Sequence, residues 1–283
     1  MVDIVWKVIV ESCCVVCPFN VEIDSSNELI YLGIRKKLGL KLGLKLYSCN
    51  IFMWPNEIKK VYIICHSIKE KTRYERLVCH LEEVGIPTHV VKFMAPVWSD
   101  ELSCEQIFSV YDPFLVRCVP GLTFKGRGLS KGEISLALNF YACIQDAVAC
   151  GYSKIITLES DIWLRADFVS RLCDLLADVT ERAWDYISLG EGVGTRPDAD
   201  KSYYAPTKGY SPPHQFVYRC TDSMMFTLPF LQKLEKTFIP FREIIDWEMN
   251  YQNMIHGAVA LWADPPLAEQ GTCFARLTSS LPA

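Results

Sequence analysis

The sequence predicts an α/β fold in which a mostly parallel, Rossmann-type sheet is flanked by helices. From residue 61 onward, short apolar runs alternate with amphipathic stretches of helical periodicity, which is typical of strands joined by helical crossovers. Within "SKIITLESD", Ile155, Ile156 and Leu158 form a continuous apolar strand of the kind that is covered on both faces. Glu159 and Asp161 follow this strand directly, and ligands of such sheets bind beyond the carboxyl ends of the strands.

The first β-α-β unit begins at "VYIICHSI". Its apolar run predicts a strand over 61–65, and the amphipathic segment after it predicts a helix over 70–84 that ends at Gly85. The run "THVVKFMA" predicts a second strand over 88–95. A loop-rich stretch is expected between this strand and the next helix.

The clearest helix is predicted over 131–149. Ser130 and Glu133 have the spacing of a capping box, and Gly151 is placed to end the helix. Apolar residues recur at helical intervals between them. This helix leads directly into the strand predicted over 154–159.

The second half of the chain continues the alternation of helices and strands. The polar segment 191–215, which contains Gly and Pro, is predicted to be a long loop, and loops of that length are usually functional or disordered. The other predicted elements are a helix over 168–179, a strand over 184–190, a strand running into a helix over 224–234, a helix over 246–256 ended by Gly257, and a final strand and turn over 258–270.

Two regions are expected along the 283 residues. Residues 1–56 have a Cys-rich apolar opening and a near-repeat of Leu, Gly and Lys over 38–46, and they are interpreted as an appended region of uncertain structure. Residues 57–283 carry the α/β pattern and are long enough for one larger domain.

Composition and the N-terminus indicate where the protein works. A formal net charge of −4 argues against broad electrostatic binding to nucleic acid. Charged residues interrupt the apolar N-terminus, so it resembles neither a signal peptide nor a transmembrane segment. We therefore expect a cytoplasmic location in which the 13 cysteines are mostly reduced. Cys14 and Cys17 lack the further ligands of a zinc site.

The carboxylates after the strand at 154–159 are the first candidate site. Glu159 and Asp161 are spaced i and i+2, which places both side chains on the same side of an extended chain. Acidic residues also end buried strands as solvated turn or cap groups, and this alternative stays open from the stretch alone. A hard cation such as Mn²⁺ or Mg²⁺ that bridges Asp161 to a nucleotide diphosphate would neutralise both the carboxylates and the leaving group.

A serine hydrolase is a competing interpretation. Residues 128–132 read Gly-Leu-Ser-Lys-Gly, a formal G-x-S-x-G, and His214 and His256 lie downstream. That motif needs a core strand immediately before the serine, whereas "LTFKGRG" is polar and rich in glycine. Ser130 is also required as the helix cap, which disfavours this function.

Several segments taken together resemble the family 25 glycosyltransferases, which include lipopolysaccharide and collagen galactosyltransferases. The resemblance covers about residues 61–280 and depends on the order and spacing of the segments. They are "VYIICHSIKEKTRYERL", "KFMAP", "KGEISLALNFYACIQDAVACGYSKIITLESD", "CTDSMMFTLPFLQKL", "EIIDWEM" and "PPLAEQ". The resemblance implies a GT-A-like fold, a nucleotide-sugar donor, a saccharide or other hydroxyl-bearing acceptor, and glycan biosynthesis as the setting.

Site residues follow from the same resemblance. It implies an acidic metal motif at Glu159 and Asp161, and donor contacts from Glu159, Thr221, Arg73 and Arg76. For the two arginines, a solvated helix face is the alternative. The family usually has two adjacent aspartates after the Glu, whereas this chain has Ser160 in the middle position, which puts the identity and strength of metal binding in doubt.

Glycosyl transfer also needs a base for the acceptor hydroxyl. The stretch "FREIIDWEMNYQ" matches the place where this family carries an acidic residue beside the acceptor, so Asp246 is the first candidate and Glu248 the second. Asp246 could instead be the N-cap of the following helix, and His256 either a metal ligand or a residue favourable to the helix C-terminus. The expected function is a metal-dependent, inverting glycosyltransferase that uses a nucleotide sugar, in particular a UDP-sugar. The alternative is a non-catalytic relative that binds the nucleotide sugar or a glycan.

Overall fold

A computed structural model of the chain describes residues 53–115, 127–190, 205–212 and 220–272. Residues 1–52 of the predicted appended region 1–56 lie outside the described residues. The assignment of 1–56 as a separate region remains a prediction. Residues 53–56 already contribute to the fold, because the Trp54 indole donates to the Ile58 carbonyl over 3.0 Å and packs against the core.

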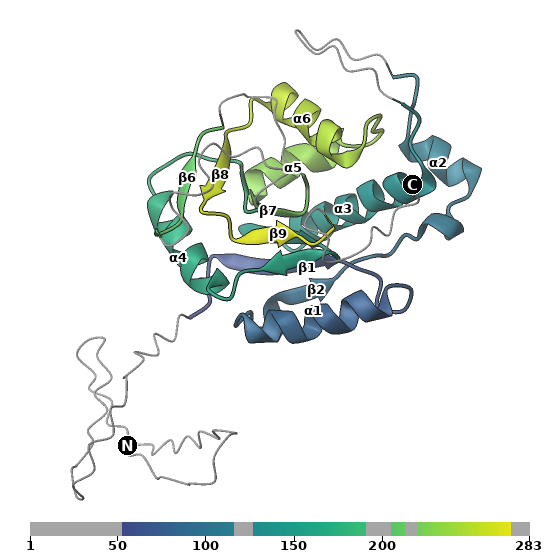
Figure 1. The fold of residues 1–283 in the computed structure, drawn as a ribbon. Helices are drawn as coiled ribbons and strands as arrows, with labels where there is room; N and C mark the ends of the chain where they lie inside the picture. Colours follow the sequence, from purple (N-terminus) through teal and green to yellow (C-terminus); the bar gives the residue numbers. More distant parts are fainter. Residues whose placement is uncertain (1–52, 116–126, 191–204, 213–219, 273–283) are drawn as a thin grey trace, which may run out of the picture. The chain divides into compact units, whose positions relative to one another are not determined.

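The centre of the described fold is a seven-stranded sheet in the order β2-β1-β3-β7-β5-β8-β6 (Figure 1). Pairing is parallel for β1 with β2 and β3 and for β5 with β8, whereas β7 is antiparallel to both β3 and β5, and β6 is antiparallel to β8. Five strands therefore share one direction, and only β7 and β6 oppose it. The strands are β1 (Ile58–Ile64), β2 (Val91–Phe93), β3 (Lys154–Glu159), β5 (Tyr186–Ser188), β6 (Lys208–Tyr210), β7 (Ser223–Thr227) and β8 (Ala260–Asp264).

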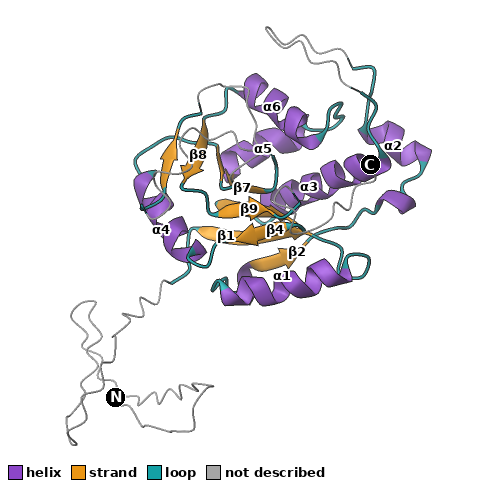
Figure 2. Cartoon of the chain, in the orientation of Figure 1, coloured by secondary structure: helices purple, strands orange, loops and turns teal. Residues whose placement is uncertain are grey.

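Helices cover both faces of this sheet (Figure 2). They are α1 (Lys71–Glu83), α2 (Cys104–Val110), α3 (Lys131–Ala149), α4 (Phe168–Asp178), α5 (Leu228–Thr237) and α6 (Ile245–His256), with 3₁₀ turns at η1 (Thr88–Val90) and η2 (Ser99–Glu101). None of the helices within these residues is both long enough and apolar enough to span a bilayer. The fold is thus a mixed α/β, Rossmann-like arrangement, as the sequence predicts.

Alternation along the strands divides the core into two layers. Val61 and Ile63 of β1 pack in one apolar cluster with residues of α1 and α4, whereas Tyr62 and Ile64 pack in the other cluster with residues of α3, α5 and α6. The same division holds in β7, where Met225 joins the first layer and its two neighbours join the second. Successive side chains of a strand point to opposite faces, so a continuous apolar run can fill both layers, as β1 and β3 do.

The helix and the strand that lead to the acidic motif have the bounds that the local sequence patterns predict. The predicted helix 131–149 and strand 154–159 coincide with α3 and β3. Ser130 and Glu133 form the expected reciprocal capping box. Gly85, Gly151 and Gly257 have φ values of 81°, 65° and 56°, a left-handed conformation that glycine adopts at helix ends without a steric penalty.

Four features depart from the sequence-based expectations. Of the strand predicted over 88–95, residues 91–93 form β2, whereas residues 88–90 form the 3₁₀ turn η1. The stretch predicted to be loop-rich contains α2, which has its own capping box between Ser103 and Gln106. The predicted loop 191–215 contains the edge strand β6 at its described end. A small antiparallel pair of β4 (Ile162–Leu164) and β9 (Ala268–Gln270) was not expected at all.

Gly209 shows why β6 can lie so close to α4. A Cβ atom at Gly209 would lie 2.7 Å from Cγ1 of Val179, at the end of α4. We predict that Gly209→Ala lowers the free energy of unfolding by about 1–3 kcal/mol, because the added methyl group overpacks this contact. Urea denaturation measures the change. Gly128→Ala is the matched control, since its added Cβ would meet nothing within 4 Å, and equal stability of the two variants would contradict the prediction.

Candidate functional site

A cleft of about 140 Å³ lies beyond the carboxyl ends of β1 and β3. This is the edge at which an open α/β sheet binds its ligands. The first turns of α3 form the opposite wall, and the segment before η2 contributes an aromatic side chain. The lining residues include Glu70 and Arg73 at the start of α1, Trp98 before η2, and Gly132 and Asn139 of α3. All three residues of the acidic motif, Glu159 to Asp161, also line the cleft.

Asp161 is buried, with 4% of its surface exposed, although it lines this cleft. Its Oδ2 accepts a hydrogen bond from the Thr272 hydroxyl. Its Oδ1 is buried and has no hydrogen-bond partner among the described residues. A carboxylate in this position is only half satisfied, and buried carboxylates normally have partners.

Thr221 joins the acidic motif to α6. Its hydroxyl lies 2.7 Å from Oε1 of Glu159 and 3.1 Å from Oδ1 of Asp246. A hydroxyl donates only one proton at a time, so the two carboxylates compete for the proton of this hydroxyl. The structure thus brings Glu159, Thr221 and Asp246, which were predicted separately, into one hydrogen-bonded group.

A further carboxylate, that of Asp222, completes an acidic group with Glu159, Asp161 and Asp246, in which Asp161 and Asp222 are buried and the other two residues are half-buried. Burial raises the pKa of Asp222 to about 7, and the negative charge of Asp161 adds to this effect. The pKa of Glu159 is raised well above its usual range by burial and then by Asp161. Burial likewise raises the pKa of Asp246, while hydrogen bonds from Thr221 act in the opposite direction. These side chains therefore favour a proton or a cation among them.

Arg73 and Arg76 hold the backbone and side chain of the acidic motif. Arg73 Nη1 donates to the Ser160 hydroxyl over 2.7 Å, and that hydroxyl donates to Oε1 of Glu70 over 2.9 Å. Arg76 donates to the carbonyls of Ser160 and Ile162, both over 2.9 Å. The two arginines do not lie on a solvated helix face, and Arg73 lines the cleft. Their contact with a donor remains a prediction.

Asp246 and Glu248 are two residues apart, within one turn of α6, but they lie in different surroundings. The N-cap of α6 is Ile244, without a side-chain cap, so the alternative that Asp246 caps this helix is wrong. Glu248 is fully buried, and its carboxylate accepts from the amides of Arg242 and Glu243 and from the Gln252 side chain. Asp246 joins the acidic group, whereas Glu248 anchors the segment that enters the helix.

His256 is in the last turn of α6, as expected. Its Nε2 lies 2.8 Å from the Thr237 hydroxyl, and its ring meets Phe230 edge-on. Burial lowers the pKa of His256. These contacts give His256 a structural position between α5 and α6.

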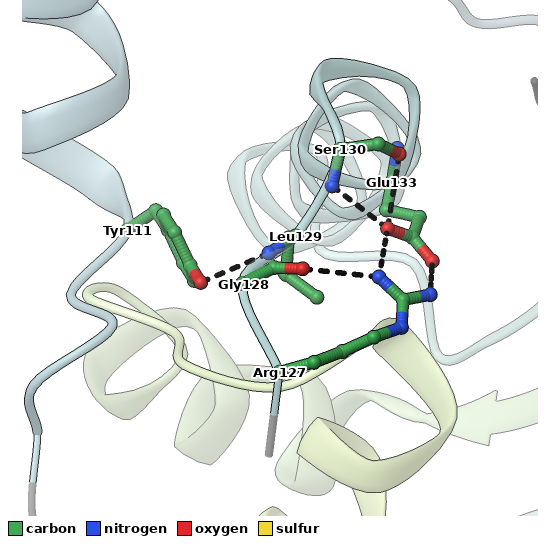
Figure 3. Close-up of polar contacts among 6 residues, drawn as sticks. All are labelled: Tyr111, Arg127, Gly128, Leu129, Ser130 and Glu133. Carbon is green, nitrogen blue, oxygen red and sulfur yellow. Dashed lines mark hydrogen bonds and ion pairs between the residues drawn. The ribbon is translucent and has the colours of Figure 1, made fainter.

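The serine hydrolase interpretation is not supported by the surroundings of Ser130 (Figure 3). No strand precedes it in the described residues 127–129. Its hydroxyl donates to Oε2 of Glu133 over 2.9 Å and accepts from the Glu133 amide, while Arg127 forms an ion pair with the same carboxylate. Leu129 is held by the Tyr111 hydroxyl. Ser130 is therefore a helix cap, and His214 lies outside the described residues.

The donor set determines what kind of cation site these residues fit. Within the described ranges, no three His, Cys, Asp or Glu side chains are arranged to hold a metal ion on their own. Mg²⁺ and similar hard cations are commonly held by one or two carboxylates together with substrate phosphates and water. The free Oδ1 of Asp161 fits that second type of site, in which a phosphorylated ligand contributes the remaining oxygens.

Comparison with known proteins agrees with the resemblance seen in the sequence. No protein-family profile matches the chain. It is 29% identical over 117 residues to the human inactive glycosyltransferase 25 family member 3, and 28% identical over 117 residues to the probable inactive glycosyltransferase 25 family member 3 of Rattus norvegicus. The mouse protein is 27% identical over the same length. Part of this chain is homologous to glycosyltransferase 25 family members.

The alignments with these relatives cover only part of each chain. Each alignment covers 37% of this chain and 20% of the relative, so the chain matches about a fifth of the length of these relatives. The names of these relatives describe them as inactive or probably inactive. The homology supports a glycosyltransferase-like protein and leaves its activity, donor and metal as questions for the site itself.

Sequence reasoning missed Asp222, Glu70 and Thr272 at this site. Asp222 stands next to the predicted Thr221, just before an apolar strand, and an acidic residue at a strand end is the same pattern that identified Glu159. The pattern points to residues that follow a strand, whereas Asp222 precedes β7. Only the antiparallel direction of β7 brings it to the same edge of the sheet.

The raised pKa of Asp222 predicts a pH dependence of stability. Between its ordinary value of 3.8 and about 7, this carboxyl is ionised in the unfolded chain and protonated in the folded one. Its contribution to the free energy of unfolding is therefore largest below pH 4 and is lost as the pH rises through 7. We predict that in Asp222→Asn the free energy of unfolding falls less steeply between about pH 5 and about pH 8 in metal-free buffer than it does in the parent. Denaturation at several pH values measures it, and equal slopes in both proteins would contradict it.

Proposed function

We propose that this protein is a metal-dependent glycosyltransferase that uses a nucleotide sugar, in particular a UDP-sugar. The observation that carries the proposal is the buried Asp161, whose Oδ1 lacks a partner among the described residues beside a cleft at the carboxyl edge of the sheet. A divalent cation bound there would compensate the charge of the diphosphate leaving group. The homology to glycosyltransferase 25 family members supports the class of reaction.

Roles for the other residues follow from their positions. Asp246 is proposed to accept the proton of the acceptor hydroxyl, since it is the candidate base that joins the acidic group. Its raised pKa makes it a stronger base once it is ionised. Thr221 orients it, and Arg73 is proposed to contact the donor from the cleft wall. A single displacement at the sugar would invert its configuration.

A non-catalytic, ligand-binding role is the second candidate. Ser160 stands where the resembling family usually has an aspartate, and its hydroxyl is bonded to Arg73 and Glu70. The matched relatives are themselves named inactive or probably inactive. A chain with this motif could keep the cleft for a nucleotide sugar or a glycan without transferring the sugar.

Incubation with a panel of nucleotide sugars and Mn²⁺, followed by detection of slow donor hydrolysis, separates the two functions. Turnover of one donor supports the transferase. Saturable binding of a donor without any turnover supports the ligand-binding role. A reducing, cytosol-like compartment belongs to the same proposal, and Cys79 and Cys104 are exposed thiols outside any disulfide.

Asp161→Ala is predicted to abolish Mn²⁺-dependent binding of UDP and to leave the fold intact. Removing a half-satisfied buried carboxylate relieves repulsion within the acidic group, so no large loss of stability is expected. Calorimetric titration of UDP with and without Mn²⁺ measures the effect. Asp100→Ala removes an exposed carboxylate beside the cleft residue Ser99 and serves as the control. Parental affinity in Asp161→Ala would remove Asp161 from the metal assignment.

Asp246→Asn is predicted to bind the nucleotide sugar normally and to transfer sugar roughly 10²- to 10⁴-fold more slowly, because it cannot accept the acceptor proton. The amide oxygen can still accept from Thr221, so its melting temperature should stay near that of the parent. Steady-state kinetics and donor titration provide the two readouts.

Glu248→Gln is the matched control for this variant. It should lower the free energy of unfolding by about 1–3 kcal/mol, because a buried carboxylate that accepts from two amides is replaced by a poorer acceptor. The folded fraction should keep its transfer rate. Equal rates in the parent and Asp246→Asn would exclude Asp246 as the base, and a loss confined to Glu248→Gln would assign that role to Glu248.

A further inference from the structure

Asp222 is a buried carboxylate with few internal partners. Only 1% of its surface is exposed, and its Oδ1 has no hydrogen-bond partner among the described residues. Its Oδ2 lies 3.3 Å from the hydroxyl of the adjacent Ser223. An ionised carboxylate in such surroundings is strongly destabilising unless a cation or a proton compensates it.

The backbone around Asp222 is shaped to leave room for this side chain. Its carbonyl accepts from the Glu159 amide over 2.9 Å, which joins it to the acidic motif at the end of β3. Gly190 follows β5, and a Cβ atom there would lie 2.3 Å from Oδ2 of Asp222. The carboxylate therefore occupies a slot that only a glycine at position 190 leaves open.

Asp161, on the neighbouring segment, likewise has a carboxylate oxygen without a hydrogen-bond partner among the described residues. This oxygen, Oδ1, is also buried, and Asp161 lines the cleft. The two residues lie on paired segments, because Leu158 pairs with Ser223 and the Glu159 amide donates to the Asp222 carbonyl. Two oxygens without partners on adjacent segments point to a shared ligand that is positively charged.

From this geometry we infer that Asp222 is a second ligand of the divalent cation, and that it holds the ion together with Asp161. The inference rests on the proposed metal-dependent function. Ser160 cannot take this part, because its hydroxyl is bonded to Arg73 and Glu70 on the side of α1. The second carboxylate thus comes from the segment before β7 and not from the acidic motif itself.

Two carboxylates leave most of the coordination sphere of Mn²⁺ or Mg²⁺ open. A nucleoside diphosphate and water would supply the other oxygens, in agreement with the absence of a three-ligand group from the described residues. Cation and nucleotide are therefore expected to bind cooperatively. Each should raise the affinity of the protein for the other by the same factor.

The test is a titration of the full chain with Mn²⁺ in the presence and absence of UDP. The electron paramagnetic resonance signal of free Mn²⁺ measures how much of the ion is bound. In the presence of UDP, Asp222→Asn and Asp161→Asn should each bind Mn²⁺ at least about tenfold more weakly than the parent. Asp100→Asn makes the same charge change on the exposed η2 turn and should stay within about twofold of the parent. In buffer with chelator, Asp222→Asn should melt at or above the parental temperature, since it removes an uncompensated buried carboxylate.

Gly190→Ala gives a second variant that keeps every carboxylate. Its methyl group displaces the Asp222 side chain, so Mn²⁺ affinity should again fall severalfold, and parental affinity would contradict the inference. If the parent and Asp222→Asn bind Mn²⁺ equally while Asp161→Asn does not, Asp222 is no ligand and the proposed function stands. If the parent itself binds no Mn²⁺ with UDP, the metal-dependent function is wrong as well.

Discussion

The candidate site depends on the direction of one strand, β7, which runs antiparallel between β3 and β5. Residues that precede an antiparallel strand lie at the edge where its neighbours end. The Glu159 amide consequently meets the Asp222 carbonyl, and the Thr221 hydroxyl reaches the Glu159 carboxylate. If β7 ran parallel to β3, Thr221 and Asp222 would lie at the opposite edge of the sheet, and the acidic motif would have neither partner.

The sequence predicts those parts of the fold that local patterns determine. Helix α3 and strand β3 were placed at their observed ends, because a capping box and a period of 3.6 residues act within a few turns. The direction of β7 and the edge strand β6 depend on tertiary pairing, which one-dimensional patterns do not report. Asp161 therefore follows from the pattern of its own strand, whereas Asp222 enters the site only through the antiparallel pairing of β3 with β7.

The positive charges near the site are used mainly to fix its backbone. Arg76 donates to the carbonyls of Ser160 and Ile162, and Arg73 contacts the side chains of Ser160 and Glu70. The motif is thus held rigidly in a region where its own carboxylates repel one another. Such an arrangement is costly for folding and suited to a cationic ligand.

Under the proposed function, catalysis and ligand binding would be linked at this site through electrostatics. Asp246 can act as a base only when it is ionised, and burial opposes that state. Its charge interacts with those of Glu159 and Asp222, so compensation of these neighbours favours the ionised form of Asp246. Loss of the compensating charge would weaken the base without any change at Asp246.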